Sequence, residues 1–200
     1  MLDLNLLQKI KERRSIFPHQ FNGKKIDKTP ILSLLESANK APSHKLTQPW
    51  FFKIFSAKSK KKLANELIKN HHSKSELFNK KTYAKFELSS HIICVCMRRD
   101  ENESIPEWEE IASTAMAVQN MWISCVNSKI GGYWSTPKTI KKLHEFLNLS
   151  QNERCLGLFY LGIYDSLDPR ILACNNIFQY TEGACEEPLE CMRAVKTLMK

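Results

Sequence analysis

Two adjacent arginines and a serine, Arg13-Arg14-Ser15, stand where a short amphipathic helix is expected to end. Two guanidinium groups beside a hydroxyl suit bidentate capture of a phosphate. The same residues also place cations at the negative end of a helix dipole, which requires no ligand. The segment therefore predicts either a phosphate site or a favourable helix end.

A second polar segment, residues 40–50, contains Lys40 and His44 and precedes an aromatic run. Pro42 and Pro49 restrict its backbone, and short polar side chains fill it. Such a rigid polar loop is typical of a ligand-facing connection, although a tight helix-to-strand connection is the structural alternative. His44 is a candidate donor to a ligand or a simple structural donor.

A third segment, residues 131–137, combines two glycines with the string Tyr133-Trp134-Ser135-Thr136. The glycines permit a close approach of the backbone to a ligand, and the indole lies beside two hydroxyls. We expect this segment to be a loop.

Motifs for other chemistries are absent from the sequence. It contains no GxxxxGK[ST] phosphate loop, GxGxxG fingerprint, HExxH helix or GxSxG nucleophile turn. The six histidines are scattered, and the seven cysteines form no CxxC pair. We expect no metal site, and we interpret Cys94 and Cys96 as small buried residues on one face of a strand.

Composition indicates a globular protein, because 42% of the 200 residues are hydrophobic and no run approaches the roughly 20 apolar residues of a membrane helix. With no secretory signal at its start, the chain is expected to be cytoplasmic, with no membrane partner. The net charge of +9 is compatible with an anionic ligand. We interpret the lysine run at residues 58–62 as a solvated helix face and expect no nucleic-acid partner.

The elements that must position these segments alternate between helices and strands. Helices are expected after Asp3 and after Thr29, and strands at residues 50–55, 92–97 and 155–163. The longest helix is expected to start with a capping box, Ser104 to Glu107, and to bury one stripe. That stripe comprises Trp108, Ile111, Ala112, Ala115, Gln119, Trp122, Ile123 and Val126. A further helix should end near Leu147, which gives a layered α+β or α/β protein.

In this order the segments resemble the FMN-dependent nitroreductase family, most closely its short, single-domain NAD(P)H nitroreductase-like members. The resemblance covers about residues 5–164. Its motifs are Arg13-Arg14-Ser15, Ala41-Pro42-Ser43-His44-Lys45 through Pro49-Trp50, Pro106-Glu107-Trp108-Glu109 and Gly131-Gly132-Tyr133-Trp134-Ser135. The chain departs from the family where Ser135-Thr136 replace a basic residue followed by serine.

The resemblance implies an α+β three-layer fold, with a central, mainly antiparallel sheet flanked by helices, in a homodimer that holds FMN at the subunit interface. NADPH or NADH would donate a hydride to the flavin, which would pass electrons to a nitroaromatic, a quinone or a similar small electrophile in a ping-pong cycle. The flavin carries this chemistry, so no catalytic side chain is expected.

The FMN-binding residues that the resemblance implies come from all three segments: Arg13, Arg14, Ser15, Lys40, His44, Trp134, Ser135 and Thr136. Lys45 and Lys85 are further candidates for positive charge near the flavin. The FMN-binding domain is expected at residues 1–165. Residues 166–200 do not resemble the family's short members and are expected to be a C-terminal extension of the same domain, either irregular or wrapped around a partner. Two alternatives remain open: a flavin-fold protein with a different or lost activity, such as reductive dehalogenation, and a basic polyanion-binding module.

Overall fold

Four strands form one antiparallel sheet at the centre of the computed structural model, which describes residues 3–71 and 75–166. In the spatial order β1-β2-β4-β3, they are β1 (Trp50–Ser56), β2 (His91–Arg98), β4 (Glu153–Ile163) and β3 (Ile130–Ser135). Elements cover both faces of β2, which explains its nearly continuous apolar run; only Arg98 is exposed. The predicted α+β class with an antiparallel sheet is confirmed.

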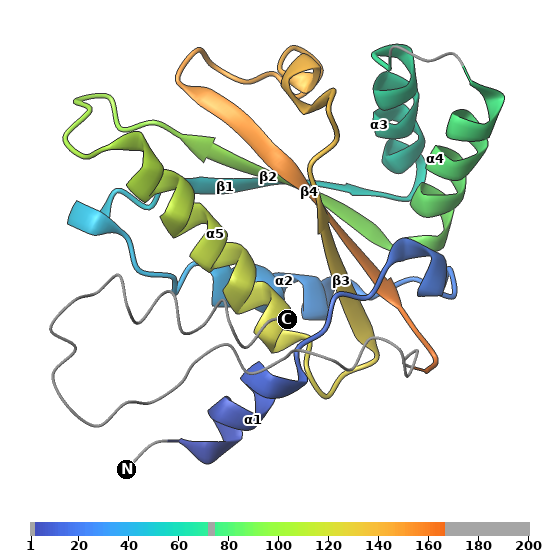
Figure 1. Ribbon diagram of the computed structural model, residues 1–200, viewed down its shortest axis with the longest axis horizontal. Coiled ribbons are helices and arrows are strands. Elements are labelled where there is room, and N and C mark those ends of the chain that lie inside the picture. Colours follow the sequence, from blue (N-terminus) through green and yellow to red (C-terminus); the bar gives the residue numbers. More distant parts are fainter. Residues whose placement is uncertain (1–2, 72–74, 167–200) are drawn as a thin grey trace, which may run out of the picture. The chain divides into compact units, whose positions relative to one another are not determined.

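Helices pack on both faces of this sheet and complete three layers. One face carries α2 (Lys28–Ala38) and α5 (Glu107–Ser124), and the other carries α3 (Ala57–Lys69), α4 (Glu76–Leu88) and the 3-10 turn η3 (Ile140–Leu143). Figure 1 shows α5 and the α3–α4 pair on opposite sides of the strands. The predicted helix near Leu147 is reduced to η3. Of the predicted extension 166–200, all but Ser166 lies outside the described residues.

The first helix, α1 (Leu4–Glu12), begins as predicted, because the Asp3 carboxylate accepts bonds from the backbone N–H groups of Asn5 and Leu6. No residue of α1 is buried. Its apolar side chains, Leu4, Leu6, Leu7 and Ile10, are all exposed. Within the described chain, this apolar side therefore has no packing neighbour that buries it.

Helix α5 corrects two predictions. It begins at Glu107 without a side-chain cap, because the Ser104 hydroxyl donates instead to the Asp100 carboxylate. The face that packs toward the sheet is also different. Its buried residues are Glu110, Ser113, Thr114, Ala117, Val118 and Met121. The predicted stripe is left exposed or half-buried, and the Trp108 side chain at its start is 66% exposed.

Strand β3 corrects a third prediction, because Gly131 and Gly132 lie in an edge strand rather than in a loop. A Cβ atom on Gly131 would lie 2.6 Å from Cβ of Ile16, and one on Gly132 would lie 2.5 Å from Cζ of Phe159. Both separations are below van der Waals contact. The glycines thus make room for protein side chains, and they allow the segment around Ile16 to lie directly on β3.

The Gly132→Ala substitution should reduce the free energy of unfolding by about 1–3 kcal/mol, because the added methyl overpacks a rigid core ring. Urea denaturation of the variant measures this. Phe159→Leu removes the colliding ring atom, so the Gly132→Ala/Phe159→Leu double variant should lose less stability than the two single losses combined. Strict additivity would contradict the contact.

Candidate functional site

The Arg13-Arg14-Ser15 segment is held between β3 and the C-terminal half of α5. The Ile16 N–H donates to the Gly132 carbonyl at 3.0 Å, and the Trp122 indole N–H donates to the Arg14 carbonyl at 3.1 Å. The Arg13 guanidinium carbon lies 4.9 Å from the centroid of the Trp122 ring, a cation–π arrangement. Sequence reasoning assigned Trp122 to the core and missed this positioning role, which no local pattern indicates.

The Arg14 guanidinium has two different environments. Its Nη1 donates to the Lys11 and Arg13 carbonyls at the end of α1, so the helix-end interpretation holds for this part of the group. Its Nε–H is buried and meets no acceptor among the described residues. One edge of the guanidinium is therefore engaged, while a buried donor remains for a ligand.

The third predicted segment also presents a buried donor. The Trp134 side chain packs over Gly157, and its indole N–H is buried without an acceptor in the described part of the chain. The Thr136 hydroxyl donates to the Leu156 carbonyl at 3.2 Å, which fixes the end of β3. Because Trp134 is two residues from the strand position that Ile16 contacts, β3 brings the first and third segments together.

Ser135 lines a cavity of about 190 Å³ on the α4 side of the sheet. Lys85, Lys138, Phe86 and Tyr160 contribute to the same cavity. The cavity therefore contains both Ser135, a predicted FMN-binding residue, and Lys85, a candidate for positive charge near the flavin. Its walls are aromatic, and its cationic groups are lysines.

The loop that carries His44 is strained and held at both sides. Lys45, Leu46 and Gln48 have φ values of 51°, 55° and 42°, the left-handed region that side chains other than glycine rarely adopt. His44 Nδ1–H donates to Oε2 of Glu109 at 2.6 Å, and the Lys45 ammonium donates to the Ser104 carbonyl at 3.0 Å. Strain of this kind concentrates at ligand-binding sites. His44 is thus fixed while 56% of its side chain stays exposed.

A buried ion pair anchors the helix end that holds this loop. The Glu110 side chain is fully buried, and it accepts bonds from the Arg99 guanidinium and from the Asp100 N–H at 2.8 Å. Hydrogen bonds to both carboxylate oxygens compensate the burial of its charge. Sequence reasoning missed Glu110, because nothing in the local pattern distinguishes it from its exposed neighbour Glu107.

The predicted site residues form two separate groups in one chain. Trp122 holds Arg14 near the C-terminal end of α5, whereas Glu109 holds His44 in its first turn. Since an α-helix rises about 1.5 Å per residue, Glu109 and Trp122 lie about 20 Å apart along its axis. Lys40 is exposed just beyond α2, where its N–H and the Asn120 side-chain amide both donate to the Ser37 carbonyl, at 3.2 and 3.1 Å. Lys40 therefore lies beside the C-terminal half of α5, and the structure does not bring His44 to Arg13-Arg14-Ser15.

The lysine run at residues 58–62 lies at the start of α3. Lys58, Lys61 and Lys62 are exposed on α3, as expected of a solvated face, whereas Lys60 is half-buried and donates to the Ser89 carbonyl. Among residues 3–71 and 75–166, no group of three His, Cys, Asp or Glu residues has the arrangement of a metal site. No helix in this part of the chain is long and apolar enough to cross a membrane.

A four-stranded antiparallel sheet between two helical layers, with an arginine segment laid on its edge strand, has the architecture of the nitroreductase-like α+β fold. The Nitroreductase family model matches residues 10–163. The chain therefore belongs to this family of oxidoreductases, as the sequence motifs predicted.

Individual relatives support the assignment. The Bacillus subtilis (strain 168) protein named "Putative NAD(P)H nitroreductase YfhC" is 28% identical over 174 residues, which cover 78% of this chain and 82% of the relative. A nitroreductase-like protein from Bacillus cereus superposes with a TM-score of 0.78 at 25% identity, covering 92% of this chain and 99% of its own. A Desulfovibrio desulfuricans nitroreductase-like structure in complex with FMN shares the fold, with a TM-score of 0.66 at 19% identity, covering 89% of this chain and 100% of its own.

Arg99→Met should reduce the free energy of unfolding, because it leaves the Glu110 carboxylate buried without its cation. Thermal and urea denaturation measure the loss. The Arg99→Met/Glu110→Met double variant should recover much of it. Lys80→Ala, which breaks the exposed Lys80–Glu76 pair, is the matched control and should cost at most about 0.5 kcal/mol. Similar losses from the exposed and the buried pair would contradict this account.

Proposed function

We propose that this protein is an NAD(P)H-dependent oxidoreductase that binds FMN and reduces a nitroaromatic, a quinone or a similar small electrophile. Family membership supports the oxidoreductase class, and the curated relatives carry NAD(P)H nitroreductase names. The observation that carries the cofactor assignment concerns two buried donors that meet no acceptor among the described residues, Arg14 Nε–H and Trp134 Nε1–H. Each lies two residues along its segment from the hydrogen bond between Ile16 and Gly132.

These donors fit the chemistry of FMN. A dianionic phosphate requires cations and N–H donors, and a flavin ring offers acceptor atoms around a flat apolar surface. In the proposal, Arg13, Arg14 and Ser15 hold the phosphate and the ribityl chain. Trp134 and Thr136 approach the ring from the end of β3. Ser135 and Lys85 line the cavity on the α4 side of the sheet, opposite to the face on which Trp134 packs, and form a separate group.

Bound FMN would supply the redox chemistry, the transfer of two electrons and a proton from NAD(P)H to the electrophile. The side chains bind, orient and exclude water. In the proposal, His44, fixed by Glu109, and Lys40 lie along the flavin edge. If NAD(P)H and the electrophile bind one after the other at the same place, the kinetics are ping-pong.

The two groups of site residues support a homodimer with FMN at its interface. One chain separates them by about 20 Å along α5. In a two-fold dimer with antiparallel α5 helices, the His44 end of one chain meets the Arg14 end of its partner, and the symmetry creates two identical sites.

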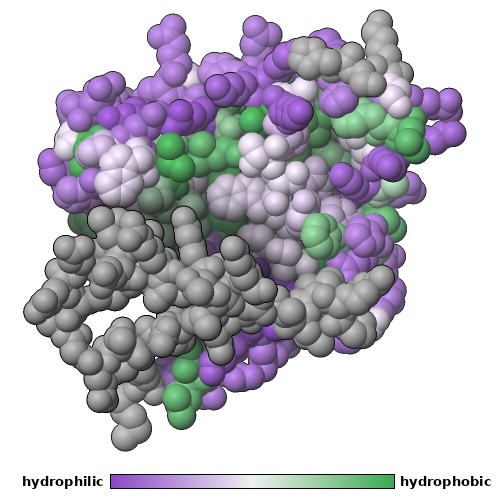
Figure 2. All heavy atoms as spheres, in the orientation of Figure 1, coloured by the Kyte–Doolittle hydropathy of each residue, from purple (hydrophilic) through white to green (hydrophobic). Residues whose placement is uncertain are grey.

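The exposed side of α5 gives such a dimer an apolar surface. Trp108, Ile111 and Met116 are 66%, 37% and 39% exposed. Figure 2 shows hydrophobic and pale side chains reaching the surface between hydrophilic margins. Contiguous apolar surface of this kind marks an interaction site.

The purified protein should be yellow, release FMN on denaturation, and lose its visible absorbance when NADPH or NADH is added anaerobically. Addition of a nitroaromatic or quinone should restore the absorbance. A halogenated phenol that reoxidises the protein while these two fail would favour the dehalogenase alternative. A colourless protein that FMN does not reconstitute would overturn the cofactor assignment.

Arg13→Ala/Arg14→Ala should weaken FMN binding by at least about a hundredfold, because it removes charge-assisted hydrogen bonds worth roughly 1.5–3 kcal/mol each. Titration of the apoprotein with FMN, followed by flavin fluorescence, measures the affinity. Lys61→Ala/Lys62→Ala removes the same charge from the exposed face of α3 and should leave the affinity unchanged. Equal losses in both variants would indicate a general charge effect rather than a site.

Mixed dimers test the shared site directly. The Arg13→Ala/Arg14→Ala chain and a His44→Ala chain should each bind FMN poorly alone. Co-expressed with different affinity tags, they should form a mixed dimer that retains one FMN, because one of its two sites then contains only unsubstituted residues. Flavin content per tagged dimer is the measurement. A mixed dimer without FMN, or a chain that binds FMN as a monomer, would refute the shared site.

A further inference from the structure

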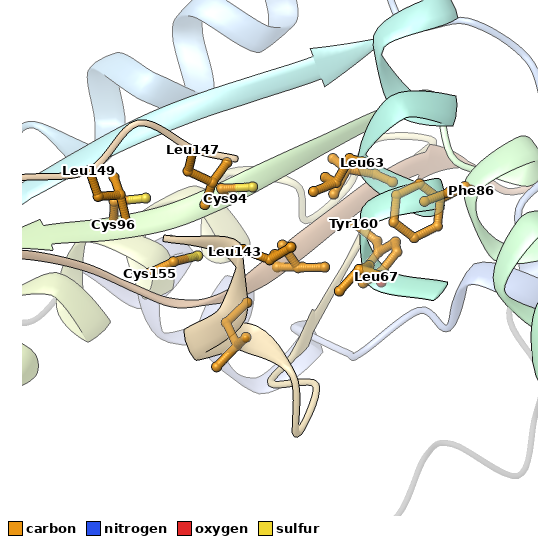
Figure 3. Packing of buried hydrophobic residues seen from close by; sticks show 14 of the residues in the cluster. Leu63, Leu67, Phe86, Cys94, Cys96, Leu143, Leu147, Leu149, Cys155 and Tyr160 are labelled. Carbon is orange, nitrogen blue, oxygen red and sulfur yellow. The ribbon is translucent and has the colours of Figure 1, made fainter. Parts of the chain in front are cut away.

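Three buried cysteines meet on the α3 side of the sheet. Cys94 and Cys96 come from β2, and Cys155 comes from β4; all three are free thiols in the same apolar cluster. Figure 3 shows their sulfur atoms on one side of the two strands, beside Leu143, Leu147 and Leu149. The proposed oxidoreductase chemistry uses none of these thiols.

The strand register selects one pair among the three. Cys96 is the direct partner of Cys155, next to a β-bulge, whereas Cys94 is opposite Leu158. Directly opposed residues of antiparallel strands have Cα atoms about 4.5–5.5 Å apart, which lies within the range of about 4.4–6.8 Å that a disulfide spans. Cys96 and Cys155 are therefore placed for a disulfide without movement of the strands.

The three sulfurs also interact with one another. Hydrogen bonds from the Cys94 and Cys96 thiols lower the pKa of Cys155 to about 4, against the opposing effect of burial. The same contacts raise the pKa of Cys94 and of Cys96. The three thiols therefore form one hydrogen-bonded group, in which Cys155 contacts both Cys94 and Cys96.

We propose that Cys96 and Cys155 form a reversible disulfide when the protein meets hydrogen peroxide. The Cys155 sulfur attacks one peroxide oxygen, the O–O bond breaks, and the leaving hydroxide takes the Cys155 proton to become water. The Cys96 sulfur then attacks the resulting sulfenic acid, the S–O bond breaks, and a second water leaves with the Cys96 proton. Two thiols are oxidised and one peroxide is reduced.

Access favours Cys155 as the first sulfur to react. Cys155, near the start of β4, is 8% exposed to solvent, whereas the exposed fraction of Cys94 and of Cys96 is 0%. The bond would join β2 to β4 one residue from Leu156, whose carbonyl holds the Thr136 hydroxyl. The inference itself rests on the cysteine geometry and not on the proposed function, so the two can fail separately.

The test is peroxide treatment of the full-length protein, followed by blocking of free thiols and mass spectrometry of tryptic peptides without reduction. We expect a cross-link between the peptide that contains Cys94 and Cys96 and the peptide that begins at Cys155, and its loss after dithiothreitol. Because one peptide holds both cysteines of β2, variants make the assignment. Cys94→Ala should keep the cross-link, and Cys96→Ala should abolish it and leave Cys155 as a sulfenic acid that dimedone traps.

Cys125 provides an internal control. It is buried at the end of α5, where burial raises its pKa to about 12, and it should stay alkylatable after unfolding of the treated protein. Circular dichroism checks that each variant is folded, and Cys96→Val replaces Cys96→Ala if the alanine variant is not. A cross-link that survives without Cys96, or a wild-type protein in which Cys155 stays reduced while surface methionines oxidise, would overturn the proposal.

Discussion

Helix α5 presents more apolar surface than one sheet can cover, and much of the structure depends on which side of it is buried. The sheet packs against the side with small residues, such as Ala117 and Val118, which lets the helix lie close to β2 and β4. The bulkier Trp108 and Ile111 remain outside. Glu110 lies on this buried side of the helix, so the orientation of α5 requires the ion pair with Arg99 to compensate its charge. The packing of α5 on the sheet thus buries its side with small residues and leaves bulky apolar side chains exposed to solvent.

The same helix determines how the predicted site residues are distributed. Its first turn holds the strained His44 loop through Glu109, and its last turns hold the arginine segment through Trp122. Each attachment is a specific hydrogen bond to a rigid element, which positions side chains better than a free loop does. The length of the helix keeps the two groups apart in one chain. The structure therefore separates residues that the family resemblance assigns to one site, and the proposed homodimer would bring them together.

Close packing at β3 is the second condition for the site. The absence of side chains at Gly131 and Gly132 allows Ile16 and Phe159 to approach the strand from its two faces. This contact draws the arginine segment onto the strand that carries Trp134. The glycines were interpreted from the sequence as space for a ligand, but they provide space for the protein itself. Their effect on the site is indirect, because they allow the arginine segment to lie against the strand that carries Trp134.

The sequence by itself determined the element types and the motif segments. The apolar run of β2, the Asp3 cap of α1 and the ordered motifs from Arg13 to Ser135 are local patterns, and they predicted the α+β class and the family. Only the tertiary structure decided which side of α5 is buried, that Glu110 pairs with Arg99, and that Cys96 faces Cys155. Periodicity reports that a helix or strand has a face, but burial and partners depend on what packs against that face.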